Sequence, residues 1–180
     1  SHYKRTTVLR RVRRRMAVHK LARLADYVHL MQRQPTETDL LFDDLLINVT
    51  GFFREPEAFE ALQAVAFPRL FAERDAQRSI RIWVPGCSTG EEVYSLAIAM
   101  LEFLGDGAAT VPVQIFATDI DAKAIEQART GIYSDAAVAV LSAARLRRYF
   151  NQVPGGWRII KPLRDLCVFA IQNLIKDPPF

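Results

Sequence analysis

The dozen residues that decide the fold are 81–92, which read Arg-Ile-Trp-Val-Pro-Gly-Cys-Ser-Thr-Gly-Glu-Glu. The apolar run 80–85 predicts a short strand, the small residues after it predict a tight turn, and the apolar spacing over 91–104 predicts a helix. Doubly wound α/β sheets bind their ligands at such a glycine-rich turn between a buried strand and a helix. The stretch therefore predicts both an α/β fold and a ligand site.

The residues of the turn also indicate what kind of ligand binds. Gly86 and Gly90 tolerate positive φ angles and let a ligand approach the backbone closely. Glu91 and Glu92 open the helix, where carboxylates are favoured by the helix dipole but repel a phosphate. The sequence has neither the G-x-G-x-x-G spacing nor a Walker lysine after the turn. A cationic ligand without phosphate fits best, and S-adenosylmethionine carries a sulfonium and an ammonium.

The same turn satisfies G-x-S-x-G, the nucleophile elbow of the α/β-hydrolases, with Ser88 as the nucleophile. Such an enzyme needs a histidine base later in the chain, whereas all three histidines (His2, His19 and His29) precede Ser88. This excludes the hydrolase interpretation for the sequence. On the turn alone, a plain connection between strand and helix stays open as an alternative.

A second β–loop–α unit follows the first. Residues 113–118 form another apolar run and 122–130 another helical pattern, which implies parallel strands joined by right-handed crossovers. Asp119 ends this strand, where a Rossmann-like fold places an acidic residue that accepts hydrogen bonds from ribose hydroxyls. Asp119 is therefore the first candidate for a ribose ligand, and Asp121 suits the N-cap of the following helix.

The remaining segments divide the chain into a helical part and an α/β part. Helical patterns precede the turn at 8–32 (one helix or a pair), 38–47 and 56–72. A helix, a hairpin and a third strand are expected after it, at 139–150, around 154–156 and at 166–171. We expect a helical domain over 1–72 and an α/β domain over 73–180 that includes a small β-subdomain at about 151–162.

The net charge of +4 is spread unevenly along the chain. Residues 1–33 are rich in arginine and contain one acid, Asp26, whereas acidic residues gather after Pro35. A basic block at one end predicts a docking surface for a negatively charged partner, with a solvated helix face as the plainer alternative.

The cysteines and the hydropathy bear on the compartment. Cys87 and Cys167 lie far apart and do not form a metal-ligand spacing, which favours a reduced, cytoplasmic protein without a metal site. No apolar run approaches the ~20 residues of a membrane-spanning helix, and the N-terminus has no secretory signal. We therefore expect no insertion into a membrane.

Several segments together resemble the CheR-type chemotaxis-receptor glutamate O-methyltransferases. The matching pieces, in chain order, are Tyr3–Met16, Asn48-Val-Thr-Gly-Phe-Phe-Arg54-Glu-Pro, Trp83–Ser95, Ala117-Thr-Asp-Ile-Asp, Ala128–Tyr133, Leu163-Arg164 and Asn173-Leu174. The resemblance implies an N-terminal all-helical domain followed by a Rossmann-like, doubly wound methyltransferase domain with a small β-subdomain. It implies S-adenosylmethionine as cofactor and S-adenosylhomocysteine as product.

The resemblance also implies which residues bind. Asn48, Thr50 and Arg54 would contact the cofactor from the junction of the domains, Glu91 would lie near its amino group, and Asp119 would bind the ribose. Asn173 and Leu174 would lie beside the adenosine, and Gly86 would let the ligand approach the turn. The basic N-terminal helix, with Arg10, Arg11, Arg14 and Arg15, would face the acidic methylation helices of the receptor.

The chemistry of glutamate methylation is consistent with these residues. A glutamate side chain, with a pKa of about 4.3, is a carboxylate at neutral pH and can attack a sulfonium methyl in line without a general base. The enzyme supplies alignment and excludes water. Arg54 is the candidate catalytic residue, because a guanidinium orients a carboxylate. A structural salt bridge to Glu55 or Glu57 is its alternative, and Phe52, Phe53 and Trp83 are expected in the core.

The resemblance stops before the end of the family's sheet, because relatives continue with another buried strand after the third one. We expect a sheet that exposes apolar surface and unpaired backbone groups, which predicts self-association, a rearranged fold or a split protein. One alternative function is a non-catalytic S-adenosylmethionine-binding signalling module. Another, less favoured, is a nucleic-acid methyltransferase; Asp177-Pro-Pro-Phe180 resembles its catalytic tetrapeptide but lies past the third strand, where a turn is expected.

Overall fold

The computed structural model describes residues 5–46, 49–72, 79–105 and 111–178. The chain forms two compact units, residues 1–47 and residues 48–180, which we call the helical unit and the α/β unit. The expected α/β class with an all-helical N-terminal part is confirmed.

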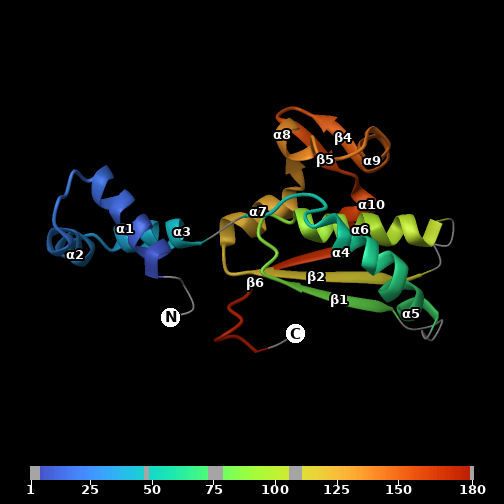
Figure 1. Cartoon of the computed structure of the whole chain (residues 1–180), viewed down its shortest axis with the longest axis horizontal. Helices are drawn as coiled ribbons and strands as arrows, with labels where there is room; N and C mark the ends of the chain where they lie inside the picture. The colour runs from blue at the N-terminus through green and yellow to red at the C-terminus, as the bar shows by residue number, and fades with distance from the viewer. Residues whose placement is uncertain (1–4, 47–48, 73–78, 106–110, 179–180) are drawn as a thin grey trace. The chain divides into compact units, whose positions relative to one another are not determined.

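The helical unit contains α1 (Arg5–Val18), α2 (Leu24–Arg33) and α3 (Pro35–Leu45) (Figure 1). The pattern at 8–32 is thus a pair of helices, separated at Lys20, whose φ of 55° lies in the left-handed region. Helix α3 begins three residues earlier than expected, because Pro35 occupies its first turn, where a missing N–H costs nothing. In the described part of this unit, Tyr27 and Glu37 are the buried residues.

The α/β unit is built on a parallel sheet in the order β1-β2-β6. Its strands are β1 (Ile80–Pro85), β2 (Val113–Asp119) and β6 (Cys167–Ile171). Ile82 lies opposite Ile115, and Ile115 lies opposite Cys167, so all three side chains share one face of the sheet. Helix α6 (Glu91–Leu104) joins β1 to β2, and α7 (Ala122–Thr130) follows β2, as the sequence predicts.

The segment 56–72 belongs to the α/β unit. It forms α4 (Pro56–Ala61), a π-helical turn η1 (Leu62–Ala66) and α5 (Phe67–Ala72). Gln63 donates a hydrogen bond to the carbonyl of Ala99 in α6 at 3.3 Å, and the rings of Phe67 and Phe103 lie 5.6 Å apart. The division between the units therefore falls at 47/48 and not at the expected 72/73, because this helical segment packs on α6.

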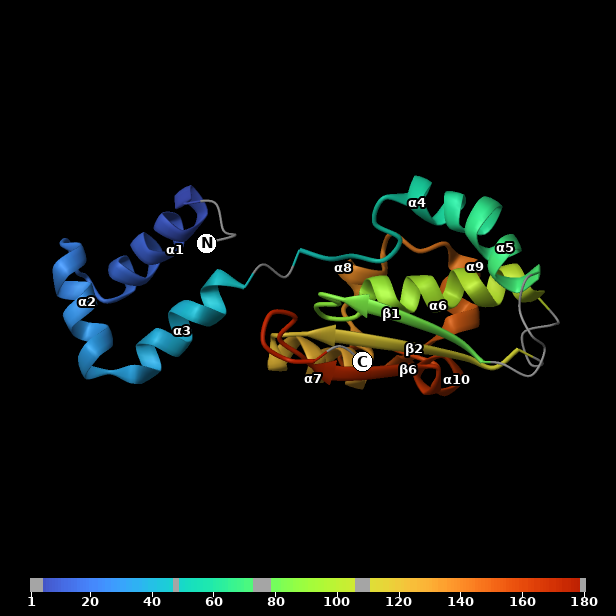
Figure 2. The same ribbon diagram turned by 90° about the horizontal axis from the view of Figure 1, so that it is seen from below.

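One face of the parallel sheet is open to solvent among the described residues (Figure 2). Trp83 lies on this face and is 43% exposed, opposite Phe116, which in turn lies opposite the exposed Val168. The expectation that Trp83 belongs to the core is wrong. Its neighbours in β1, Ile82 and Val84, point to the other face, toward the core.

A small antiparallel sheet in the order β3-β5-β4 makes up the β-subdomain. Its strands are β3 (Ile132–Tyr133), β4 (Phe150–Val153) and β5 (Gly156–Ile159); the helices around it are α8 (Asp135–Val138), α9 (Ala143–Tyr149) and α10 (Lys161–Asp165). The expected hairpin is β4-β5. The helix expected at 139–150 is shorter, because Ser142 caps a new helix by accepting a hydrogen bond from the amide of Arg145.

Candidate functional site

The turn after β1 has the strained backbone that its composition predicts. Gly86, Ser88 and Gly90 have φ angles of 70°, 48° and 92°. A Cβ atom on Gly90 would lie 2.9 Å from the Cβ of Ala128, so only glycine fits between the turn and α7. The amide of Cys87 donates to the carbonyl of Thr118 at 3.0 Å, which ties the turn to the end of β2.

Asp119 joins the two β–loop–α units. Its Oδ2 accepts a hydrogen bond from the amide of Ser88 at 2.8 Å, and its Oδ1 accepts one from the amide of Asp121 at 2.9 Å. Asp121 caps α7, accepting from the amides of Lys123 and Ala124. The Asp119 carboxylate, at the end of β2, is therefore hydrogen-bonded to the glycine-rich turn that follows β1.

Glu91 directly follows the glycine-rich turn and is the first residue of α6. It is 7% exposed, and its Oε2 accepts a hydrogen bond from the hydroxyl of Thr89 at 2.6 Å. The Tyr133 hydroxyl donates to the carbonyl of Thr89 at 2.7 Å, and burial raises the pKa of Tyr133. A buried carboxylate thus occupies the helix N-terminus where a phosphate-binding turn would leave free amides. The arrangement suits a cationic ligand.

The segment 49–54 is anchored to the same first turn of α6. The amide of Phe53 donates to the hydroxyl of Ser95 at 2.9 Å, and that hydroxyl donates to the carbonyl of Glu91 at 2.7 Å. Phe52 is buried, as expected, with its ring 4.9 Å from that of Tyr133. Thr50 is half-buried in this anchored segment, whereas Asn48 lies outside the described residues.

Arg54 follows the anchored segment and is exposed. Its Nη1 donates to the carbonyl of Val49 at 2.7 Å, and it makes no ion pair with Glu55 or Glu57 in the described structure. Arg54 also lines a hollow of about 580 Å³ between α4–α5 and β1, whose wall at the carboxyl end of β1 includes Trp83 and Glu92. The described structure therefore does not show the salt bridge to Glu55 or Glu57 that was the alternative role for Arg54.

Asn173 and Leu174 lie past the end of β6, next to Asp119. The amide of Gln172 donates to the carbonyl of Asp119 at 2.9 Å, and Asn173 forms a turn in which its Oδ1 accepts from the amide of Ile175. Leu174 is 55% exposed, and the neighbouring Ile171 and Ile120 are exposed too. This places an exposed apolar surface beside the Asp119 carboxylate, which the sequence predicts to bind a ribose.

Asp177 and Pro178, the first two residues of the tetrapeptide 177–180, contact this turn. Asp177 accepts a hydrogen bond from the amide of Asn173 at 2.7 Å, and the carbonyl of Pro178 accepts one from the side chain of Gln172. Residues 179–180 lie outside the described residues. Asp177 thus lies in a turn, as expected, and does not end a strand.

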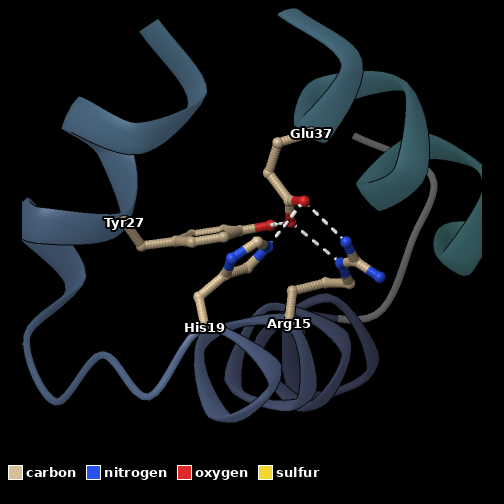
Figure 3. A network of polar contacts seen from close by, with 4 residues as sticks. All are labelled: Arg15, His19, Tyr27 and Glu37. Carbon is tan, nitrogen blue, oxygen red and sulfur yellow. Dashed lines mark hydrogen bonds and ion pairs between the residues drawn. The ribbon is translucent and has the colours of Figure 1, made fainter. Parts of the chain in front are cut away.

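The arginines predicted for partner docking differ in their surroundings. Arg10 and Arg14 are exposed on α1, as is Arg13, which the sequence-based set omits. Arg11 is half-buried, and its Nε is a buried donor without a hydrogen-bond partner. Arg15 forms a salt bridge with the buried Glu37, so its charge is compensated within the helical unit (Figure 3).

Sequence reasoning did not identify Glu37 or Tyr27 as important residues. An acidic residue in the first turn of a helix is ordinarily explained by the helix dipole, and only the folded arrangement shows the three partners of Glu37. Both cysteines are reduced, and burial raises the pKa of the Cys87 thiol to about 12, which argues against a nucleophilic thiol in the turn.

No group of three or more His, Cys, Asp or Glu side chains in the described ranges is arranged to hold a metal ion. Within the same ranges, no helix has both the length and the apolar character that crossing a bilayer requires.

The fold and the site together define a Rossmann-like domain whose turn after β1 suits a cationic ligand such as S-adenosylmethionine. Comparison with known proteins agrees: residues 48–180 match the family described as "CheR methyltransferase, SAM binding domain", and residues 1–46 match "CheR methyltransferase, all-alpha domain". The chain belongs to the CheR methyltransferase family, whose cofactor is S-adenosylmethionine.

Individual relatives cover nearly all of the chain. Chemotaxis protein methyltransferase 2 of Pseudomonas aeruginosa is 35% identical over 94% of this chain and 60% of its own length. The chemotaxis protein methyltransferase of Escherichia coli is 32% identical over 96% of this chain and 59% of its own. A 104.1 kDa uncharacterized protein of Rhodobacter capsulatus is 36% identical over 99% of this chain, which spans 19% of that protein. The chain thus spans about 60% of the two chemotaxis methyltransferases.

Proposed function

We propose that the protein is an S-adenosylmethionine-dependent protein-glutamate O-methyltransferase that acts on chemotaxis receptors in the cytoplasm. The observation that carries this proposal is the pair of carboxylates at the turn after β1. Asp119 is hydrogen-bonded into the turn, and Glu91 is buried at the start of α6. The relatives named chemotaxis protein methyltransferases support the same reaction.

The cofactor would be held along the carboxyl ends of the parallel strands. In this proposal Asp119 binds the ribose hydroxyls, Glu91 pairs with the cationic amino-acid part, and Asn173 and Leu174 border the adenosine. Gly86 permits close approach to the backbone, while Asn48, Thr50 and Arg54 contribute from the segment before α4. The hydrogen bonds from Phe53 to Ser95 and from Ser95 to Glu91 fix that segment beside the turn.

The bound cofactor supplies a methyl group activated by a sulfonium. The substrate carboxylate needs no base, so the residues of the chain contribute binding, orientation and exclusion of water. Arg54 is the candidate orienting group, because a guanidinium pairs with a carboxylate through two parallel hydrogen bonds. Its one described hydrogen bond, to the Val49 carbonyl, leaves its other N–H donors available.

The acidic methylation helices of receptors are the proposed partners of α1. Arg10 and Arg14 are exposed on one side of this helix together with Arg13. The sequence also predicts Arg11 and Arg15 as docking residues. Of the four predicted arginines, Arg15 is the least suited to contact a partner, because it is paired with Glu37.

The cofactor site is tested by calorimetric titration of the chain with S-adenosylhomocysteine. We expect binding on the order of micromolar for the wild-type chain and a loss of tenfold or more, about 1.4 kcal/mol, for Asp119→Ala. Glu126→Gln is the matched control, since Glu126 is an exposed acid on α7 whose side chain is 70% accessible. Equal affinities of the wild-type and Asp119→Ala chains would contradict the assignment.

A methyl-transfer assay then separates the proposed enzyme from its alternatives. Labelled methyl groups should appear on receptor glutamates as base-labile esters. Binding of the cofactor without transfer would favour a non-catalytic signalling module. Transfer to nucleic acid, with affinity that falls steeply as salt rises, would favour the nucleic-acid methyltransferase.

A further inference from the structure

A single buried carboxylate links the three helices of the helical unit (Figure 3). Glu37 of α3 is 2% exposed. Its Oε1 accepts hydrogen bonds from Nε of Arg15 in α1 at 2.8 Å and from the hydroxyl of Tyr27 in α2 at 2.7 Å. Its Oε2 lies 2.5 Å from Nη2 of Arg15 and 2.8 Å from Nε2 of His19, just past the end of α1.

These contacts compensate the cost of burying the charge. A buried carboxylate is strongly destabilising unless paired and hydrogen-bonded, and the two-pronged contact with Arg15 is the strongest geometry for such a pair. The hydrogen bond from Arg15 holds the pKa of Glu37 at about 2, so the side chain stays ionised. Burial, with the nearby Glu37 carboxylate, raises the pKa of Tyr27 to about 12, so the phenol remains a donor.

The same contact sorts the arginines of α1 into two sets. Arg15 points inward, where 14% of its side chain is accessible. With 3.6 residues per turn, Arg13 lies nearly opposite Arg15 on the helix, and Arg10 and Arg14 lie about 60° and about 100° from Arg13 in the same direction around the axis, so the three occupy one arc of about 100°. All three outer arginines are exposed. The rotation of α1 about its own axis, which the Arg15–Glu37 contact fixes, therefore determines where the outer arginines point.

We propose that Glu37 is a positioning residue for partner docking: by holding Arg15, it fixes α1 so that Arg10, Arg13 and Arg14 face an acidic partner helix as one set. This inference rests on the proposed docking function and adds an acidic residue that binding of an acidic partner requires.

For Glu37→Gln, the proposed positioning role and the change in net charge predict opposite effects on the affinity for an acidic peptide. Glu37→Gln makes the whole chain more positive, so long-range electrostatics alone would tighten binding of an acidic peptide. Positioning predicts weaker binding, by about tenfold. The probe is a fluorescein-labelled synthetic amphipathic helix with glutamates along one face, titrated with the full chain and followed by fluorescence anisotropy. Asp39→Asn is the matched control, because Asp39 is exposed on the same helix and its substitution changes the charge equally.

The salt dependence of binding gives a readout that a general loss of stability does not move. Fewer outer arginines should reach the peptide in Glu37→Gln, so its affinity should fall less steeply with salt than that of the wild type or of Asp39→Asn. Tyr27→Phe removes one donor to Glu37 without changing the charge, and it should weaken binding in the same direction by a smaller factor. If circular dichroism shows that Glu37→Gln fails to fold, Tyr27→Phe tests the positioning role in its place.

Each outcome bears on a different claim. If the wild-type chain binds the peptide and Glu37→Gln binds it as tightly as Asp39→Asn does, the positioning role is overturned and the docking surface stands. If the wild-type chain binds S-adenosylhomocysteine but no peptide, the proposed docking function fails, and the positioning role fails with it. The affinity for S-adenosylhomocysteine should be unchanged in all three variants.

Discussion

Individual residues at the proposed site carry structural and chemical tasks at once. Asp119 holds the amide of Ser88 while it is the candidate ribose ligand, so its loss affects the turn as well as the cofactor. Arg54 is simpler, because its described hydrogen bond goes to a local carbonyl. Arg54→Lys keeps the charge and removes the planar fork, so we expect kcat for receptor methylation to fall about tenfold or more. Arg69→Lys, an exposed control on α5, should leave kcat unchanged in the same assay.

Two adjacent glycines lie in the β4–β5 hairpin, Gly155 in its turn and Gly156 at the start of β5. Gly155 has a φ of 89° with open space around its missing Cβ, whereas a Cβ on Gly156, at a φ of 141°, would lie 2.1 Å from the carbonyl oxygen of Tyr133. Gly155→Ala should lower the free energy of unfolding by about 1 kcal/mol, and Gly156→Ala by roughly 3 kcal/mol or more. Urea denaturation followed by circular dichroism measures both. Equal effects would contradict the close approach of β3 to the start of β5.

Elements with a regular apolar pattern were predictable from the sequence, whereas elements that form only by pairing with a distant segment were not. Helices 91–104 and 122–130 and strand 80–85 have the expected bounds, because apolar spacing and glycine or aspartate boundaries mark them. The two-residue strand Ile132–Tyr133 exists only as a partner of β5, which no local pattern announces. The exposed position of Trp83 was missed because β1 is mostly apolar, although the exposed Arg81, two residues before Trp83, marks the same face as the one toward solvent.

The junction of α1, α2 and α3 should respond to acid through Glu37. Its pKa is lowered from 4.5 to about 2 in the folded chain, so it stabilises the fold above about pH 4.5, and this stability is lost as pH falls through about 2. The full contribution is roughly 3 kcal/mol. Thermal unfolding of the helical unit, wild type against Glu37→Gln, should therefore show a gap at pH 6 that narrows toward pH 2. A gap that is independent of pH would contradict the ionised state of Glu37.

For the whole molecule, the open face of the parallel sheet is the feature with the largest consequence. In the described residues β1 pairs with a strand on one side only, and Trp83 and Val168 are exposed on that face. We predict self-association through this sheet at high concentration, measurable by sedimentation equilibrium. Val168→Lys should shift the equilibrium toward monomer. Val140→Lys should not, although Val140 of the β-subdomain is more exposed, at 70%.

The two tryptophans of the chain, Trp83 and Trp157, lie one in each sheet of the α/β unit, and the helical unit has none. The indole of Trp83 donates to the hydroxyl of Thr118 at the carboxyl end of the sheet, and that of Trp157 donates to Asp135. Tryptophan fluorescence therefore reports on the α/β unit alone. Unfolding of the helical unit is silent in that signal, so a melt with one fluorescence transition leaves residues 1–47 unobserved.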